Sequence, residues 1–344
     1  MTEPRRSNRR VTIDDIARHA GVSKGAVSYA LNGRVGVSDA TRARILAIAD
    51  ELGWYPNRAA RALSAARADA CGLVMARPAS LLALEPFYME FLSGVEAELS
   101  ARAVALTIQL VENPEEEIEV YRRWWAERRV DGVMLVDLRF DDPRIPALVE
   151  LGLPAVVVGG PLADGLLPAV WNDEASPVDE AVRYVAALGH RRIARVAGPR
   201  DFVHTAQRTD AFETVVNRLG LEGSVVNTDY STEGGARATR MLFLKPDRPT
   251  AILFDSDVLA VTGLGVAQEM GLVVPDDVSI IAWDDSLMCQ VVHPALTTMT
   301  RDVTAYGTAA ARRLLDAINA TGAGDVAGPS AELRARASTG RSRP

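Results

Sequence analysis

The chain has 344 residues, of which 48% are hydrophobic and 24% charged, a composition that suits two ordinary globular domains. No apolar run approaches the ~18 residues of a membrane-spanning helix, and no apolar segment follows the basic residues 1–10, so we expect neither a membrane span nor a secretory signal. Cys71 and Cys289 stand singly, outside any metal-ligand spacing, which predicts two buried thiols in a reducing cytoplasm, no metal and no cofactor.

The net charge of −7 conceals an uneven distribution along the chain. Residues 1–67 carry 12 Lys and Arg against 6 Asp and Glu, a net charge of +6, whereas the remainder carries 26 against 39, a net charge of −13. A positive segment joined to a negative body suits a DNA-binding module attached to a domain that must not adhere to DNA. A merely solvated basic tail would explain Arg5 to Arg10, but not the basic residues after them.

The residues after this tail predict three short helices. Thr12 can cap the first, which Gly21 ends, while Ser23 can cap the second and Ser38 the third. Apolar residues recur three and four positions apart in the first helix, which gives it one buried stripe. Two helices joined by a turn of about four residues that contains Gly form the helix-turn-helix pattern.

The second helix of such a motif presents its N-terminal residues to base edges in the major groove. Lys24 can donate to guanine or phosphate, Gly25 permits a close approach, and Tyr29 can reach a base or a thymine methyl group. The candidate DNA-binding residues here are Thr12, Ser23, Lys24, Gly25, Ser28, Tyr29 and Asn32. The alternative is a three-helix module that binds another protein.

The run VTIDDIARHAGVSKGAVSYALNGR, from Val11 to Arg34, resembles the DNA-binding headpiece of the lactose-repressor (LacI) family. The similarity covers the VT-I-x-D-I-A opening, the A-G-V-S turn and the V-S-x-x-L-N close. Ala26 departs from the pattern, because the family usually has Thr there, and this removes a hydroxyl that could contact phosphate.

Residues 57–67 predict a hinge helix or linker. Asn57 can cap a short helix that starts at Arg58, but so few helical residues are marginal in water unless a partner orders them. The resemblance implies that this helix folds on the minor groove, where Leu63 of each subunit wedges between base pairs at the operator centre. Asn57, Arg58 and Leu63 are therefore further DNA-binding candidates, and a plain linker with Leu63 packed on the body is the alternative.

From Cys71 onward, short apolar runs alternate with amphipathic segments. The expected strands are Gly72–Ala76, Val104–Leu110, Asp131–Asp137, Pro154–Gly159, Arg192–Gly198, Ala251–Asp255 and Val278–Trp283. The expected helices are Phe87–Ala101, Glu115–Arg129, Pro177–Leu188, Thr205–Leu219 and Val258–Met270. Such alternation predicts an α/β fold of parallel, doubly wound sheets, and its length predicts two lobes with a ligand cleft between them.

The resemblance to the family continues through this body and implies a two-lobed domain like a periplasmic binding protein. It implies that the Arg208 guanidinium donates to sugar hydroxyls, that Asp284 accepts from them and that Tyr230 stacks on the ligand. The implied ligand-binding residues are Phe87, Asp173, Arg208, Tyr230, Ser256 and Asp284. Three departures from the family pattern leave the ligand's identity open: Glu174 stands where the family often has Asn, and Pro177 and Ala282 stand where it usually has Gly.

Several of these residues have structural alternatives. Arg208 and Asp284 could form an ion pair with each other, and Tyr230 could be a rim residue. Asp257 is expected to be a helix N-cap rather than a ligand contact. His190, in a turn between helix and strand, is expected to be structural.

No catalytic motif is present in its required setting: no G-x-S-x-G stands on a strand–turn–helix, G-x-x-x-x-G-K-[ST] is absent, and Gly263-Leu264-Gly265 falls inside an expected helix. We therefore expect no enzyme and no catalytic residues. A secreted sugar-binding protein, the second rival, would carry no helix-turn-helix. The resemblance implies a cytoplasmic repressor that binds a palindromic operator as a homodimer and is released by a small sugar-like effector, with a purine-like corepressor left open.

The expected organisation is a basic tail (1–10), a helix-turn-helix domain (11–56), a hinge (57–67) and a ligand-binding and dimerisation domain (68–344).

Overall fold

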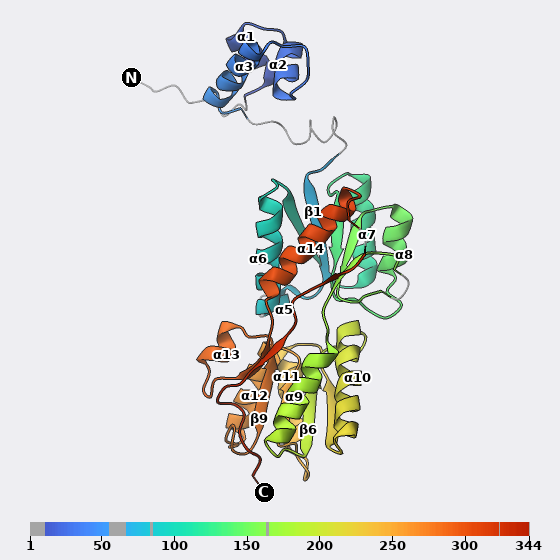
Figure 1. Cartoon of the computed structure of the whole chain (residues 1–344), viewed down its shortest axis with the longest axis vertical. Coiled ribbons are helices and arrows are strands. Elements are labelled where there is room, and N and C mark those ends of the chain that lie inside the picture. The colour runs from blue at the N-terminus through green and yellow to red at the C-terminus, as the bar shows by residue number, and fades with distance from the viewer. Residues whose placement is uncertain (1–10, 55–66, 83–84, 163–164, 323, 344) are drawn as a thin grey trace, which may run out of the picture. The chain divides into compact units, whose positions relative to one another are not determined.

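A computed structural model describes residues 11–54, 67–82, 85–162, 165–322 and 324–343 (Figure 1). The chain divides into two compact units, Met1–Ala68 and Asp69–Pro344. The basic tail and the DNA-binding candidates Asn57, Arg58 and Leu63 lie outside the described residues.

The smaller unit contains the three predicted helices. They are α1 (Ile13–Ala20), α2 (Lys24–Leu31) and α3 (Asp39–Glu51). In each helix the capping hydroxyl accepts a hydrogen bond from the backbone N–H three residues further on, and these caps are the expected Thr12, Ser23 and Ser38. Ile16, Val27 and Ile45, one from each helix, are fully buried in a shared core. Gly21 ends α1 with a φ of 64°, a conformation that glycine adopts without strain.

The larger unit consists of two lobes, each built on a six-stranded sheet. The strands are β1 (Ala70–Ala76), β2 (Ala105–Val111), β3 (Gly132–Leu135), β4 (Ala155–Val158), β5 (Ala169–Trp171), β6 (Arg192–Ala197), β7 (Glu222–Asn227), β8 (Ala251–Phe254), β9 (Ser279–Trp283), β10 (Thr297–Thr300), β11 (Val326–Ala327) and β12 (Glu332–Arg334). The first sheet has the order β11-β5-β4-β3-β1-β2 and is parallel throughout. The second has the order β12-β10-β9-β8-β6-β7, with only β12 antiparallel.

Helices cover both faces of the sheets, which is why the central strands β3, β4, β8 and β9 are buried along their whole length. The helices are α5 (Ala79–Leu82), α6 (Pro86–Ser100), α7 (Pro114–Ala126), α8 (Arg144–Leu151), α9 (Ala175–Ala187), α10 (Val203–Arg218), α11 (Thr232–Phe243), α12 (Asp257–Glu269), α13 (Leu287–Val291) and α14 (Val303–Ile318). None of the described helices is long and apolar enough to cross a bilayer.

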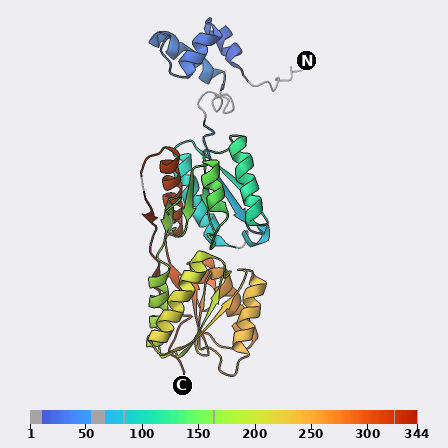
Figure 2. The ribbon, with the colours of Figure 1, turned by 90° about the vertical axis from the view of Figure 1, so that its right-hand side faces the viewer.

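The described chain passes between the lobes after β5, after β10 and after β11. As a result α14, near the end of the sequence, packs against α6 in the first lobe (Figures 1 and 2). The two lobes are therefore joined by several segments and not by a single linker.

The predicted α/β class is confirmed, and each expected strand and helix of the body overlaps an observed one. Cys71 and Cys289 are buried free thiols, as expected, and the Gly263-Leu264-Gly265 run lies inside α12. Several observed elements were not predicted from the sequence, among them β7, β10, α8, α11 and α14. β7 has only half-buried or exposed residues, because it lies at the edge of its sheet, and so shows no apolar run.

Two glycines allow α6 and α14 to approach closely. A Cβ atom at Gly94 would lie 1.9 Å from the carbonyl oxygen of Thr304, and one at Gly307 would lie 2.0 Å from that of Phe91. Both neighbours are backbone atoms of the facing helix, so neither can move aside alone. The attachment of α14 to the first lobe therefore depends on these two positions.

We predict that Gly94→Ala destabilises the protein by about 1–3 kcal/mol, because the added methyl group forces the two helices apart. Gly265→Ala is the matched control, since this glycine is also helical but a Cβ there meets nothing within 4 Å. The control is expected to keep or slightly raise stability. Urea unfolding of both variants decides the point, and equal midpoints would contradict the prediction.

Candidate ligand pocket and nucleic-acid interface

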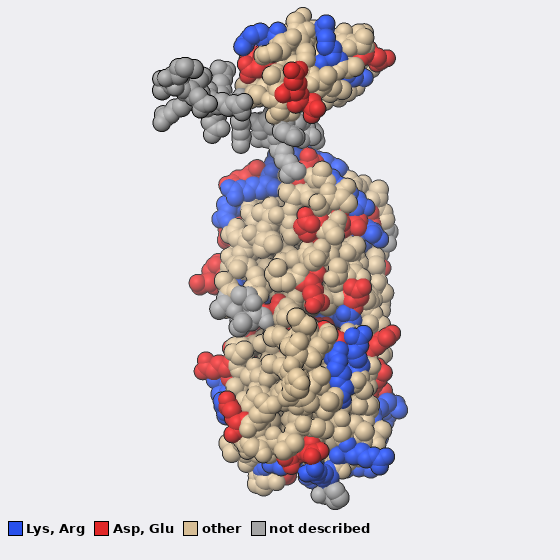
Figure 3. All heavy atoms as spheres, turned by 90° about the vertical axis from the view of Figure 1, so that its left-hand side faces the viewer, with Lys and Arg blue, Asp and Glu red and all other residues tan. Residues whose placement is uncertain are grey.

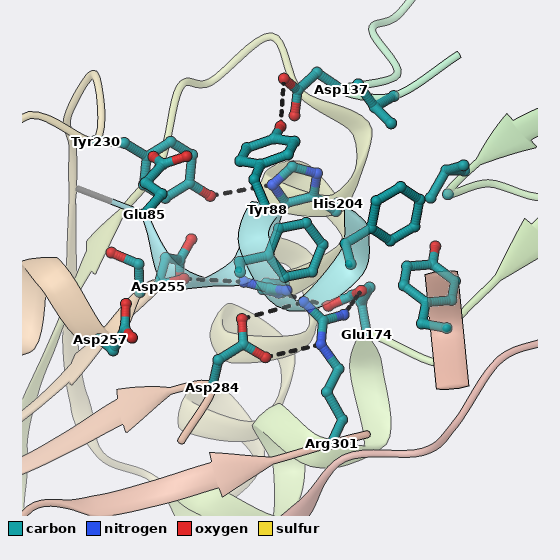
Figure 4. Close-up of a pocket in the computed structure, with 18 of the residues that line it drawn as sticks. Glu85, Tyr88, Asp137, Glu174, His204, Tyr230, Asp255, Asp257, Asp284 and Arg301 are labelled. Carbon is teal, nitrogen blue, oxygen red and sulfur yellow. Dashed lines mark hydrogen bonds and ion pairs between the residues drawn. The ribbon is translucent and has the colours of Figure 1, made fainter. Parts of the chain in front are cut away.

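A pocket lies between the two lobes, where the carboxyl ends of strands from both sheets face each other (Figure 4). It holds about 790 Å³, including the part open to solvent. Five strands each supply one charged residue at or just beyond their carboxyl end. These residues are Arg77 after β1, Asp137 after β3, Asp255 after β8, Asp284 after β9 and Arg301 after β10. Helices supply further polar side chains, among them His204 and Arg208 from α10.

Five of the six ligand-binding candidates line this pocket: Phe87, Arg208, Tyr230, Ser256 and Asp284. Asp173 does not. Its carboxylate accepts hydrogen bonds from the backbone N–H groups of Ala175 and Ser176 at the start of α9, at 2.9 and 3.1 Å, and it lies beside a second, more open groove. The structure thus brings five candidates together and gives Asp173 a position at a helix end.

Arg208 and Asp284 do not pair with each other, contrary to the structural alternative. Arg208 Nε donates to Glu174 Oε2 at 2.6 Å, and its guanidinium group lies 3.8 Å from the ring centre of Trp283. Asp284 Oδ1 accepts from Arg301 Nε at 2.8 Å, while Arg301 Nη1 lies 3.5 Å from the other oxygen of Glu174. The four charged groups form one nearly buried cluster, the Glu174 cluster.

A second charged cluster surrounds Arg77 at the first-lobe wall. Arg77 donates to both oxygens of Glu85 at 2.8 Å and, through Nε, to Asp137 at 2.7 Å. Burial raises the pKa of Asp137, but Arg77 outweighs it and the pKa falls to about 2. The Arg77 guanidinium also lies 5.1 Å from the Tyr88 ring centre and 5.4 Å from that of Tyr230, which belongs to the second lobe. This side chain therefore joins both walls of the pocket.

His204 is the imidazole of the pocket. Burial, with the positive charge of Arg208 adding to it, lowers its pKa to about 4, so the ring is neutral at physiological pH. Its Nε2 lies 3.1 Å from the Tyr230 hydroxyl. His190 lies elsewhere, bonded to Thr250 and to the Gly340 carbonyl group, which is the structural position that the sequence predicted.

Asp257 differs from its expected position. The N-cap of α12 is Ser256, whose hydroxyl accepts from the backbone N–H of Leu259 at 3.2 Å. Asp257 is the first helical residue, is only 4% exposed and lines the pocket. Burial, and then the charge of Asp284, raise its pKa to about 6, although the Ser286 hydroxyl opposes the shift. The expectation that Asp257 is an N-cap was therefore wrong.

Several residues of the pocket were not predicted from the sequence. Arg77, Glu85, Asp137, His204 and Arg301 were not candidates, yet all line it. Arg77 and Asp137 directly follow or end predicted strands, so a search of every strand's carboxyl end would have found them. Arg301 follows β10, which the sequence analysis did not identify. Among the described residues, no group of three or more His, Cys, Asp or Glu side chains could hold a metal ion.

The smaller unit exposes the side of α2 that was expected to meet DNA. The side chains of Lys24 and Tyr29 are exposed, and a Cβ atom at Gly25 would meet nothing closer than the Ser23 hydroxyl at 3.8 Å. Lys24 Nζ lies 2.6 Å from Asp14 Oδ1, so this carboxylate already neutralises it. Asn32 donates to the Ser28 carbonyl group at 2.9 Å, which places both at the end of the same helix.

Two family models match the chain. One for bacterial regulatory proteins of the lacI family matches residues 12–57, and one for a periplasmic binding protein-like domain matches residues 182–339. The HTH-type transcriptional regulator CelR of Thermobifida fusca is 33% identical over 321 residues, which cover 90% of this chain and 92% of that protein. The regulator AglR of Rhizobium meliloti (strain 1021) is 34% identical, covering 96% and 94%.

Solved structures agree with this match. A CelR–cellobiose complex has a TM-score of 0.73 and 31% identity, covering 96% of this chain and all of that one. The lac repressor dimer bound to operator and the anti-inducer ONPF has a TM-score of 0.84 at 24% identity, with the same coverage, and supports the fold alone. Headpiece, body and pocket together define a DNA-binding transcriptional regulator. The chain belongs to the LacI family of bacterial regulatory proteins.

We predict that the Asp257 carboxylate makes the body less stable as pH rises. Its pKa of about 6 lies above the ordinary 3.8, so the folded state holds a proton that the unfolded state loses first. Wild-type stability relative to Asp257→Asn is expected to fall by about 2 kcal/mol between pH 4 and 6 and to level off above that range. Urea unfolding of both proteins across this pH range measures it, and parallel curves would contradict the assignment.

Proposed function

We propose that this chain is a cytoplasmic repressor of carbohydrate uptake or catabolism genes, which binds a palindromic operator as a homodimer and is released by a sugar-like effector. The pocket between the lobes carries this proposal. It combines the arginine forks of Arg208 and Arg301 and the carboxylate of Asp284 with the aromatic rings of Phe87 and Tyr230. Charged forks suit pairs of sugar hydroxyls, and aromatic faces suit the apolar faces of sugar rings.

The pocket also suits release by a ligand, because its charged clusters include the segments that join the lobes. Glu174 lies between β5 and α9, and Arg301 lies between β10 and α14. A ligand that contacts Arg208 competes with Glu174 for it, and a ligand that contacts Asp284 competes with Arg301. We expect the ligand to bind one arrangement of the two lobes more tightly than another. This difference in binding free energy couples the pocket to the DNA-binding residues, and such coupling free energies are typically ~1–3 kcal/mol. The proposal includes DNA binding by the hinge candidates Asn57, Arg58 and Leu63.

One face of the body supports a homodimer. The side of the larger unit that carries α6 and α13 shows a broad area without charged side chains (Figure 3). Met89 on α6 is 64% exposed, and Leu287 and Val291 on α13 are 71% and 59% exposed. Exposed apolar patches of this kind mark interaction surfaces. A second copy of the chain, related by two-fold symmetry, would also match a palindromic operator.

We infer that the chain is not an enzyme. The neutral His204 is bonded to Tyr230, and the pocket's carboxylates pair largely with arginines. The relatives CelR and AglR are named as transcriptional regulators. Turnover of a sugar by the purified protein would contradict this inference.

Selection of fragmented genomic DNA on the purified protein, at roughly 0.15 M salt, tests the proposed function. We expect a short palindrome to be enriched near transport or catabolic genes, with a flexible pyrimidine–purine step at its centre if Leu63 wedges there. Lys24→Ala should weaken specific binding by about tenfold or more. Arg44→Ala, a matched loss of charge on α3, should change it little. Only uniform, salt-sensitive binding, with or without added sugars, would count against a sequence-specific repressor.

Arg208→Ala is expected to raise the concentration of sugar that releases the operator by about tenfold or more, because hydrogen bonds to a charged group are lost. Arg218→Ala, at the exposed end of the same helix, is the matched control and should respond like the wild type. Operator affinity can be followed by fluorescence anisotropy across a panel of mono- and disaccharides that includes cellobiose. A normal response of Arg208→Ala would refute the assigned pocket, and tightening by the ligand would identify a corepressor.

A further inference from the structure

We propose that the effector carries a positively charged ammonium group, as an amino sugar does, and that this group lies between Glu85 of the first lobe and Asp257 of the second. The inference rests on the proposed function, since it assumes that this pocket holds the sugar-like effector.

The charges of the pocket do not balance. Six carboxylates line it, but only three arginines do, and a fourth arginine, Arg195, reaches one of the carboxylates from behind. The carboxylates are Glu85, Asp137, Glu174, Asp255, Asp257 and Asp284, and the lining arginines are Arg77, Arg208 and Arg301. His204 is neutral and adds no positive charge. Two of the six carboxyl groups are therefore left without a cation of their own.

The excess lies on one side of the pocket. In the Glu174 cluster two arginines face two carboxylates, and Asp255 has the buried Arg195 at 2.5 Å to itself. On the other side, Arg77 alone serves both Glu85 and Asp137. Asp257 takes part in none of the ion pairs found in the described part of the chain. Figure 4 shows Glu85 and Asp257 on one side of the pocket, with the paired Asp255 near them, and Glu174 with Arg301 on the other side.

Asp257 is the least satisfied of these groups. Its side chain is buried, and Oδ1 accepts from the backbone N–H of Val258 at 2.7 Å. Its Oδ2 accepts no hydrogen bond: the Ser286 hydroxyl lies close enough to lower the pKa, but not in hydrogen-bonding geometry. A buried carboxylate without a cation is unfavourable unless it takes up a proton or gains a partner.

The charge of Asp257 also acts across the cleft. It contributes to the raised pKa of Glu85, about 7, for which burial is the main cause. It likewise raises the pKa of Glu90, further along α6, after burial and the charge of Asp284. The facing carboxylates of the two lobes therefore repel each other, and a cation held between them would relieve both. Among the described residues no group of three or more His, Cys, Asp or Glu side chains could hold a metal ion, whereas an ammonium group has only three N–H donors to satisfy.

Matched pairs of ligands test the inference on the full-length protein by isothermal titration calorimetry at pH 7. The pairs are glucose with glucosamine, galactose with galactosamine, and cellobiose with the β-1,4-linked glucosamine disaccharide. We expect the amino member of a binding pair to bind at least about tenfold more tightly, which corresponds to about 1.4 kcal/mol. Asp257→Asn and Glu85→Gln should each remove most of this preference. Glu96→Gln, an exposed carboxylate on the same α6, should retain it.

The outcomes separate this inference from the proposed function. A neutral sugar that binds as tightly as its amino counterpart overturns the ammonium proposal and leaves the sugar pocket standing. A preference that survives in both Asp257→Asn and Glu85→Gln, with far-UV circular dichroism showing both folded, also overturns it. Failure of every pair to bind overturns this inference and counts against the sugar-like effector of the proposed function, while operator binding is decided separately by the selection of genomic DNA.

Discussion

Buried charge at the junction of the two lobes constrains the rest of the body. Arg208 and Glu174 are 3% and 9% exposed in their side chains, and Arg301 is 8% exposed. Charges removed from water in this way need partners with good geometry, because a single partner's loss leaves an uncompensated ion. Since Glu174 and Arg301 lie on segments that cross between the lobes, the pairing of these charges is tied to how the lobes are arranged. Ligand binding in the pocket and the arrangement of the lobes therefore depend on the same network of ion pairs.

Contacts outside the ion network also join the two lobes. The backbone N–H of Val203 donates to the carbonyl group of Leu138 at 2.9 Å, and Arg139 pairs with Asp201. Each of these contacts joins a loop after β3 to the start of α10, and so joins the first lobe to the second. Neither these contacts nor the ion pairs of the Glu174 cluster bury much apolar surface, whereas each lobe has its own buried apolar core. Changes on ligand binding are therefore expected at the crossovers and rims and not inside the lobes.

The sequence alone predicted what depends on local interactions. Thr12, Ser23 and Ser38 cap helices through groups three residues away, so their positions can be recognised without knowing the fold. Buried parallel strands such as β8 are continuous apolar runs and were found, whereas the edge strand β7 was not. The partners of Arg208 could not be predicted, because Glu174 is 34 residues away and meets it only once α9 has packed against α10. Likewise the role of Asp257 depends on the opposing wall, which no local pattern encodes.

The departure of Glu174 from the family pattern gains a physical explanation from its neighbours. Arg208 and Arg301 both approach this position, and Asp284 alone would leave two buried guanidinium groups with one carboxylate. An asparagine, which is neutral, could accept hydrogen bonds there but could not balance the second charge. Glu174 therefore supplies the carboxylate that balances Arg208, at 2.6 Å, while Asp284 balances Arg301, at 2.8 Å, and the contact of 3.5 Å between Arg301 and Glu174 joins the two pairs.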